Sequence, residues 1–156
     1  MHQPVASDLR RVASVLKVNG DLERISNLAR NIAKRVKKLA SDPRAFPIPQ
    51  ELESMALETL GQVRDSLDAL TKSDAGLART VIAGDGTIDR HYRVVLKALK
   101  DQIRNDPDRL NTWLRLINTA RNLERIADHA TNIAEAVVFL KEGDIIRHAT
   151  ENEMTS

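Results

Sequence analysis

The chain of 156 residues contains no cysteine. Disulfide bonds, thiolate nucleophiles and zinc sites built on thiolates are therefore excluded. Aromatic residues are also scarce, at 3% of the sequence, so the hydrophobic core must be built from Leu, Ile, Val and Ala. So few rings provide no base-stacking pattern, which argues against the binding of nucleic acid in single-stranded form.

Long apolar runs are absent as well. No run approaches the ~18 residues that a membrane span requires, and the first fourteen residues hold a proline and three charged side chains where a signal peptide would be apolar. Acidic and basic residues are interspersed, which leaves a net charge of only +2. One basic cluster stands near the end of the first predicted helix, where it complements the helix dipole; contact with anionic lipid or an acidic partner is the alternative. It consists of Lys34, Arg35, Lys37 and Lys38.

What the sequence does contain is helical periodicity. Apolar residues recur at steps of three and four, which predicts an all-α fold with helices over about 7–39, 50–70, 75–103 and 109–141. Ser7 is the expected N-cap of the first helix and Gly143 the expected C-cap of the last. The prolines of 43–49 should break the chain between the first two helices, since proline lacks an N–H and restricts its predecessor.

The apolar residues of each helix define the expected core. In the third helix the stripe keeps its phase across Gly84 and Gly86, which favours one continuous helix over two short ones separated by a turn. The predicted stripes are Leu22, Ile25, Ala29, Ile32, Val36 and Leu39; Leu52, Ala56, Leu60, Val63, Leu67 and Leu70; and Leu77, Val81, Ile88, Tyr92, Val95, Leu99 and Ile103.

An internal repeat organises the chain. Residues 22–39 read LERISNLARNIAKRVKKL and residues 123–140 read LERIADHATNIAEAVVFL, and ten of the eighteen positions are identical at an offset of 101. A period this long indicates a duplicated supersecondary unit rather than a solenoid. The second copy follows a helical hairpin, whereas the first has only 21 residues ahead of it. We therefore expect the last helix of an incomplete repeat (1–42), a complete three-helix repeat (43–149) and a polar tail (150–156). A natural short form and a shortened version of a longer protein both fit this pattern.

Acidic side chains follow a second pattern within the helices. Glu124 and Asp128 are four residues apart in the last helix, and Asp85 and Asp89 have the same step in the preceding one. Residues at i and i+4 share a helix face, so two neighbouring helices could present four oxygen donors to hard or borderline metal ions. The alternative is a plain solvated face. His129 points about 100° away from Asp128 on the helix, and we do not expect it to be a ligand.

With these motifs the sequence resembles the PhoU family. The matching stretches are QPVASDLR (3–10), the two LERI motifs and GDGTID (84–89), in the same order as in the family and over nearly the whole chain. The resemblance implies two tandem three-helix bundles, of which the first two helices are absent here. It also implies surface metal clusters of iron or zinc, or of magnesium or manganese. The metal ligands it implies are Asp85, Asp89, Glu124 and Asp128, with a weaker second site at Glu23 and Asn27, where the family usually has Asp in place of Asn27.

The function implied by the resemblance is regulatory. Family members act in the cytoplasm and hold the phosphate-starvation response off when phosphate is plentiful. They link the phosphate ABC transporter, through its ATPase subunit, to a sensor histidine kinase, and reach the membrane only through these partners. We expect no enzyme, because no catalytic constellation or phosphate-binding glycine loop is present. The alternatives are a metal-independent helical scaffold and a metal-dependent phosphohydrolase.

The first helix raises the question of a partner. Its N-terminal half is apolar almost all round, and such a helix is normally buried. We expect a second copy of the chain to cover it as a homodimer; the alternative is a monomer in which the helix frays at its start. The apolar residues are Leu9, Val12, Ala13, Val15, Leu16 and Val18.

Overall fold

The computed structural model describes the backbone of residues 3–154 and the side chains of residues 5–143. It contains four α-helices: α1 (Gln3–Ala40), α2 (Gln50–Lys72), α3 (Ala75–Asn105) and α4 (Leu110–Met154), with one 3-10 turn, η1 (Pro107–Arg109), before α4. No strand occurs in residues 3–154. The all-α prediction is confirmed, and α3 runs unbroken through Gly84 and Gly86 as expected. No helix in the described part of the chain is long and apolar enough to cross a membrane.

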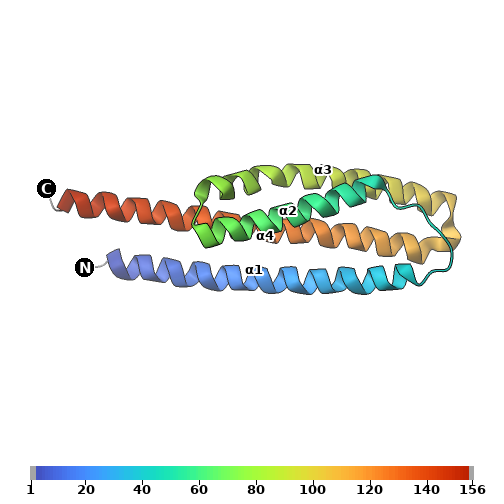
Figure 1. Ribbon diagram of the computed structural model, residues 1–156, viewed down its shortest axis with the longest axis horizontal. Helices are drawn as coiled ribbons and strands as arrows, with labels where there is room; N and C mark the ends of the chain where they lie inside the picture. Colours follow the sequence, from blue (N-terminus) through green and yellow to red (C-terminus); the bar gives the residue numbers. More distant parts are fainter. Residues whose placement is uncertain (1–2, 155–156) are drawn as a thin grey trace.

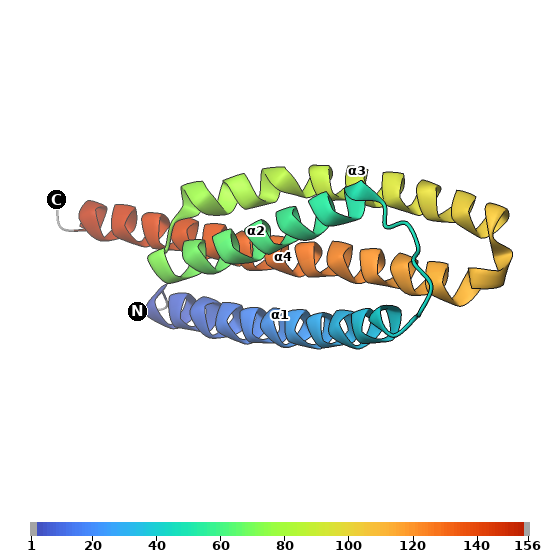
Figure 2. The ribbon, with the colours of Figure 1, turned by 45° about the vertical axis from the view of Figure 1, so that its right-hand side comes forward.

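The helices form a three-helix bundle with one helix added. α2, α3 and α4 contact one another, whereas α1 lies along α4 alone. Figure 1 shows α1 on the side of α4 away from the α2–α3 hairpin, and Figure 2 shows the same arrangement after a turn of 45°. This is the predicted architecture of a complete repeat preceded by one long helix.

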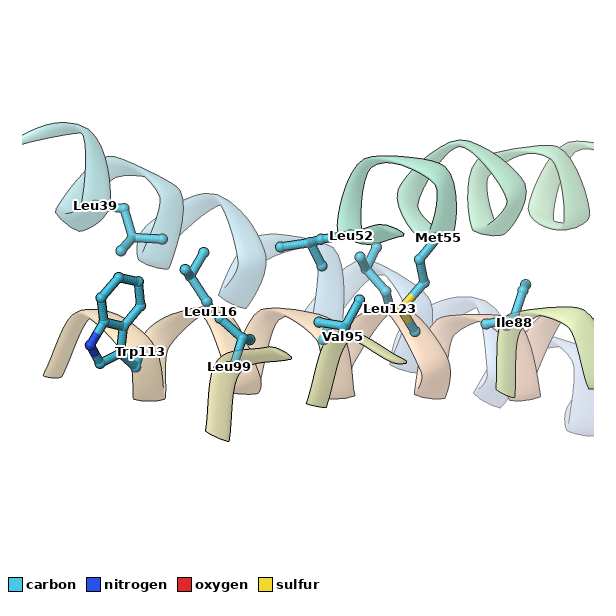
Figure 3. Close-up of a cluster of buried hydrophobic side chains, with 11 residues drawn as sticks. Leu39, Leu52, Met55, Ile88, Val95, Leu99, Trp113, Leu116 and Leu123 are labelled. Atoms are coloured by element: carbon cyan, nitrogen blue, oxygen red, sulfur yellow. The ribbon is translucent and has the colours of Figure 1, made fainter. Parts of the chain in front are cut away.

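The main core lies between the three helices of the bundle. Met55, Val95 and Leu99 are fully buried against α4, and Trp113 on α4 is 1% exposed. Figure 3 shows these side chains meeting along α4, with Leu39 of α1 reaching Trp113 at one end. The indole N–H of Trp113 donates to the Asp106 carbonyl at 2.9 Å, which satisfies the one polar atom that the ring takes into the core.

Two predicted helix ends are wrong. α1 begins at Gln3 rather than at Ser7, because Pro4 then falls in the first turn, where its missing N–H costs nothing. α4 passes through Gly143 and continues to Met154 instead of ending in a polar tail; residues 155–156 lie outside the described residues. Gly143 does not adopt positive φ. It permits a close approach, since a Cβ there would lie 2.6 Å from the Arg10 Nη1.

The predicted stripe of α1 is partly wrong. Leu22, Ala29 and Val36 are exposed, and the stripe that faces α4 runs through other positions. Because α1 has a single neighbour, only a narrow strip of its surface is covered. That strip consists of Ser7, Arg10, Ser14, Val18, Asp21, Ile25, Leu28, Ile32, Arg35 and Leu39.

The stripe of α2 agrees with the prediction at every position except Leu60, and that of α3 agrees throughout. In α2, Leu60 is exposed and the buried residues are Leu52, Met55, Thr59, Ser66 and Ala69. In α3, all seven predicted residues are buried or half-buried. Between these helices, Ser73 takes the left-handed conformation that ends α2, and the Asp74 carboxylate accepts the Leu77 N–H at 3.0 Å to begin α3.

Candidate metal centre

The four predicted carboxylates lie on adjacent antiparallel helices. Asp85 and Asp89 are on α3, Glu124 and Asp128 are on α4, and these two helices pack along their length. The Thr131 hydroxyl on α4 donates to an oxygen of Asp85 at 3.4 Å, so Asp85 faces α4. Asp128 is exposed and the other three carboxylates are half-buried. The structure thus brings the two acidic pairs to one surface of the α3–α4 interface.

The four carboxylates repel one another, and the positive charge of Arg125 offsets only part of this repulsion at Glu124 and Asp128. Burial raises the pKa of Glu124, and the charges of Asp128, Asp89 and Asp85 raise it further. Although Asp128 is exposed as a whole residue, partial desolvation of its carboxyl raises its pKa, the charges of Asp85 and Asp89 raise it further, and His129 and Arg125 oppose the shift. None of the ion pairs recorded among residues 5–143 neutralises any of the four. A cation at this surface would relieve a repulsion that the chain itself leaves in place.

The donor set fits a metal ion in its chemistry and less well in its present side-chain positions. Carboxylate oxygens are the ligands of hard divalent cations and are also used by iron and zinc. Within residues 5–143, however, no three Asp, Glu, His or Cys side chains are close enough together to hold an ion as they stand. Ligation would therefore require the four carboxylates to turn toward one another.

The weaker predicted site has no second helix beside it. Glu23 and Asn27 are both exposed on α1, and α1 contacts only α4. These two residues are not brought together with any of the other predicted ligands. The other acidic residue of this region, Asp21, is buried on the opposite side of α1, where it faces α4.

Asp21 belongs to a polar contact that the sequence analysis missed. Its Oδ1 lies 2.8 Å from the His129 Nδ1 and accepts the Asn132 side-chain N–H at 3.2 Å. Its Oδ2 is buried without a hydrogen-bond partner. His129 therefore points toward α1 and away from the carboxylates of α3, in agreement with the expectation that it is not a ligand. The signal was available, since Asp21 lies three residues after Val18 and four before Ile25, on the face that packs.

Comparison with known proteins identifies the family. A profile described as the PhoU domain matches residues 1–36 and 52–137. The chain is 40% identical to a phosphate-specific transport system accessory protein PhoU homolog of Pseudomonas putida, over 99% of this chain and 60% of the relative. It is 39% identical to the homolog of Pseudomonas aeruginosa, over 94% of this chain and 60% of that protein.

A solved structure matches the chain in both fold and sequence. The crystal structure of PhoU from Pseudomonas aeruginosa matches with a TM-score of 0.85 and 38% identity, over 92% of this chain and 68% of that one. The chain spans about three-fifths of the length of the curated relatives described above. A profile match over most of the residues, a 40% identical relative and a shared fold together show that the chain belongs to the PhoU family.

Proposed function

We propose that this protein is a non-catalytic regulator of phosphate uptake and of the phosphate-starvation response. The observation that carries the proposal is the 40% identity, over 99% of the chain, to a relative named as an accessory protein of the phosphate-specific transport system. The proposed partners are the ATPase subunit of the phosphate ABC transporter and a phosphate-sensing histidine kinase. The proposed location is the cytoplasm, with contact to the membrane only through these partners.

The proposal includes a metal site at Asp85, Asp89, Glu124 and Asp128. Its support is the juxtaposition of two acidic pairs on α3 and α4 and the raised pKa of Glu124 and Asp128. A bound divalent or trivalent ion would supply positive charge and would tie α3 to α4. Iron, zinc, magnesium and manganese all accept carboxylate oxygens. In this proposal the residues hold an ion and orient the surface around it, and they carry out no reaction.

A phosphohydrolase is the less favoured function. Metal-assisted hydrolysis needs a substrate cavity next to the ion. The recorded cavity beside Gly84 is open, is lined by Glu58, Gln62 and Thr80 among others, and does not include any of the four carboxylates. We therefore expect no turnover of phosphate esters, with or without added metal. Turnover that is abolished by Glu124→Gln would establish the enzyme instead.

The regulatory role is tested in a bacterium that lacks its own PhoU relative. The chain should restore repression of a phosphate-starvation reporter in phosphate-rich medium, and should co-purify with the transporter ATPase and the kinase. A chain that is expressed and folded but neither represses the reporter nor binds either partner would refute the role.

The metal site is tested separately on purified protein. Elemental analysis and calorimetric titration with Mn²⁺, Zn²⁺ and Fe²⁺ should show binding that Glu124→Gln with Asp128→Asn weakens by more than about tenfold, or ~1.4 kcal/mol. The matched control removes two carboxylates elsewhere, Glu53→Gln with Asp101→Asn, and should bind as the parent does. Equal metal content in both double variants would show that the acidic face is only solvated, as in a metal-independent scaffold.

The exposed side of α1 also requires an explanation. Val5, Leu9, Val12 and Leu16 are all more than half exposed, so the premise of the expected homodimer holds. A second copy of the chain is one way to cover these residues.

A further inference from the structure

Positive charge gathers along the second half of α3, on the side of the bundle away from α1 (Figures 1 and 2). Residues 90–104 carry five basic side chains and one acidic side chain, although the whole chain has a net charge of only +2. The five basic residues are all exposed. They recur at alternating steps of three and four, which places them along one side of the helix over about 21 Å. We call this set the basic row of α3: Arg90, Arg93, Lys97, Lys100 and Arg104.

The chain supplies little negative charge to the basic row. Among the ion pairs recorded within residues 5–143, the row takes part only in that between Arg104 and Asp101, at 2.9 Å, and none joins Arg93 to Asp89 one turn before it. The stretch of α4 that shares the main core with this half of α3, residues 110–123, contains no Asp or Glu. Like charges at such helical steps repel one another and weaken a helix. A negatively charged partner would relieve this repulsion.

Apolar side chains lie on both sides of the basic row. Val94 is 43% exposed and Leu96 is half-buried, and at 100° per residue they stand on opposite sides of the row. A hollow of about 440 Å³ opens between the long side chains next to Leu96. It is lined by Arg93, Leu96, Lys97, Lys100, Asp101 and Arg104. The surface therefore combines a line of positive charge with apolar contacts at its margins.

The spacing of the row distinguishes among negatively charged partners. Alternating steps of three and four are those at which one helix contacts another along a seam, so acidic residues at the same steps on a second helix would meet every cation of the row. Helices that bind membranes insert an apolar face, whereas the apolar face of α3 is buried in the bundle through Ile88, Val95 and Leu99. Binding of single-stranded nucleic acid relies on stacking against aromatic rings, and Tyr92, the one ring in this stretch, packs against the core.

We propose that the basic row of α3 is a docking surface for an acidic α-helix of a partner protein. That helix carries Asp or Glu at alternating steps of three and four over about four turns, with apolar residues beside them that contact Val94 and Leu96. The proposal rests on the charge and spacing of α3. It is independent of the metal site and of the regulatory role, and none of the proposed metal ligands belongs to the row.

A synthetic peptide tests the surface directly. The probe is a fluorescently labelled helix of about six turns, with Glu at alternating steps of three and four and with Ala, Leu and Gln elsewhere. Binding to the full chain is measured by fluorescence anisotropy in chelator. Arg93→Gln with Lys97→Gln and Lys100→Gln should weaken binding by at least about tenfold.

The matched control removes three exposed cations from α1 instead, Lys34→Gln with Lys37→Gln and Lys38→Gln, and so changes the net charge by the same amount. It should bind the peptide within about twofold of the parent. Circular dichroism establishes that both triple variants are folded. Equal weakening by the two triple variants would refute the docking surface, since binding would then follow net charge alone. Failure of the parent chain to bind the peptide would refute it as well.

Two further peptides separate helical spacing from charge. One has the same composition in a scrambled order, so that its Glu residues spread around the helix, and the other has a central Pro that breaks the helix. Both should bind at least about tenfold more weakly than the first peptide. Equal binding by all three would overturn the preference for a helix.

Vesicles of phosphatidylglycerol and phosphatidylethanolamine in equal parts, and a short duplex DNA, represent the other anionic surfaces. Neither should displace the peptide at a matched concentration of negative charge. Displacement by one of them, with loss of its binding in the Arg93→Gln triple variant, would overturn the proposal in favour of a membrane or a nucleic acid. Glu124→Gln with Asp128→Asn should bind the peptide at least as well as the parent. Loss of binding in that variant would overturn the assignment of the surface to the basic row.

Discussion

Loss of the contact between Asp21 and His129 should lower the stability of the packing between α1 and α4. The Asp21 side chain is only 9% exposed, and its charge faces the His129 ring at 2.8 Å. Replacing His129 by Leu, the residue at the equivalent position 28 of the first repeat, leaves a buried carboxylate with Asn132 as its only recorded partner. Leaving a buried hydrogen-bond acceptor without this partner costs about 1–3 kcal/mol. Native domains have a total stability of only about 5–15 kcal/mol.

The double variant provides the decisive comparison. Asp21→Leu with His129→Leu removes both polar groups and fills the space between α1 and α4 with apolar atoms. Replacing a buried pair by apolar residues is often neutral or stabilising. We therefore expect the double variant to recover most of the loss, with a coupling of about 0.5–3 kcal/mol between the two sites.

Urea denaturation followed by circular dichroism measures these free energies, and amide exchange shows whether the loss falls on α1. A matched control is Lys38→Leu, which changes an exposed charge on the same helix and should shift stability by less than about 0.5 kcal/mol. The reasoning fails if His129→Leu costs no more than this control. It also fails if the double variant is as unstable as the sum of the two single variants.

Three other predictions concern the bundle. Without metal, Glu124→Gln with Asp128→Asn should raise the melting temperature at neutral pH. The raised pKa of each carboxyl means that the folded state binds the proton more tightly, so the stability that this proton contributes is present in acid and is lost as pH rises through the folded pKa. In chelator, the melting temperature of the variant should therefore rise relative to that of the parent between pH 4 and 7. Parallel curves of melting temperature against pH would contradict this. Gly86→Ala should raise the free energy of unfolding in urea by about 0.5–1 kcal/mol, because nothing lies within 4 Å of its Cβ position. Gly84→Ala should raise it less, because its Cβ would lie 2.9 Å from the Gln62 side-chain nitrogen. The reverse order would refute this account of the α2–α3 contact. Met55→Ala should cost about 2–5 kcal/mol, whereas Leu57→Ala on the exposed side of α2 should cost far less, and equal losses would show that the core has been misplaced.

The sequence was sufficient for the features that depend on helical periodicity. The unbroken stripe across Gly84 and Gly86 predicted a continuous α3, and the repeat predicted that one helix stands before a complete three-helix unit. The pairing of Asp85 and Asp89 with Glu124 and Asp128 on neighbouring helices was also predicted from their spacing. Whether these residues bind metal stays a prediction.

The sequence was insufficient where the number of neighbours decides burial. Periodicity marks an apolar face but does not say whether another helix covers it, and so Leu22 and Val36 were placed in a core although they are exposed. The spacing of Asp21 from Val18 and Ile25 indicates that this carboxylate lies on the packing face, but the sequence does not say which residue of α4 it meets, and so the contact with His129 was missed. At Gly143 the helix continues, and the missing side chain leaves room for Arg10 instead of ending the helix.

The single-sided attachment of α1 has a consequence for how the chain unfolds. A nine-residue segment with three prolines joins α1 to α2, and within residues 3–154 α4 is the helix against which α1 packs. α1 therefore forms a cooperative unit of its own, and its separation from α4 leaves the buried contacts among α2, α3 and α4 largely intact. Unfolding should proceed in two stages, of which the first exposes the α1-facing side of α4. A partner that binds α1 only while α1 is packed on α4 raises the free energy of the first unfolding stage by mass action. With such a partner bound, the whole chain should unfold in a single transition.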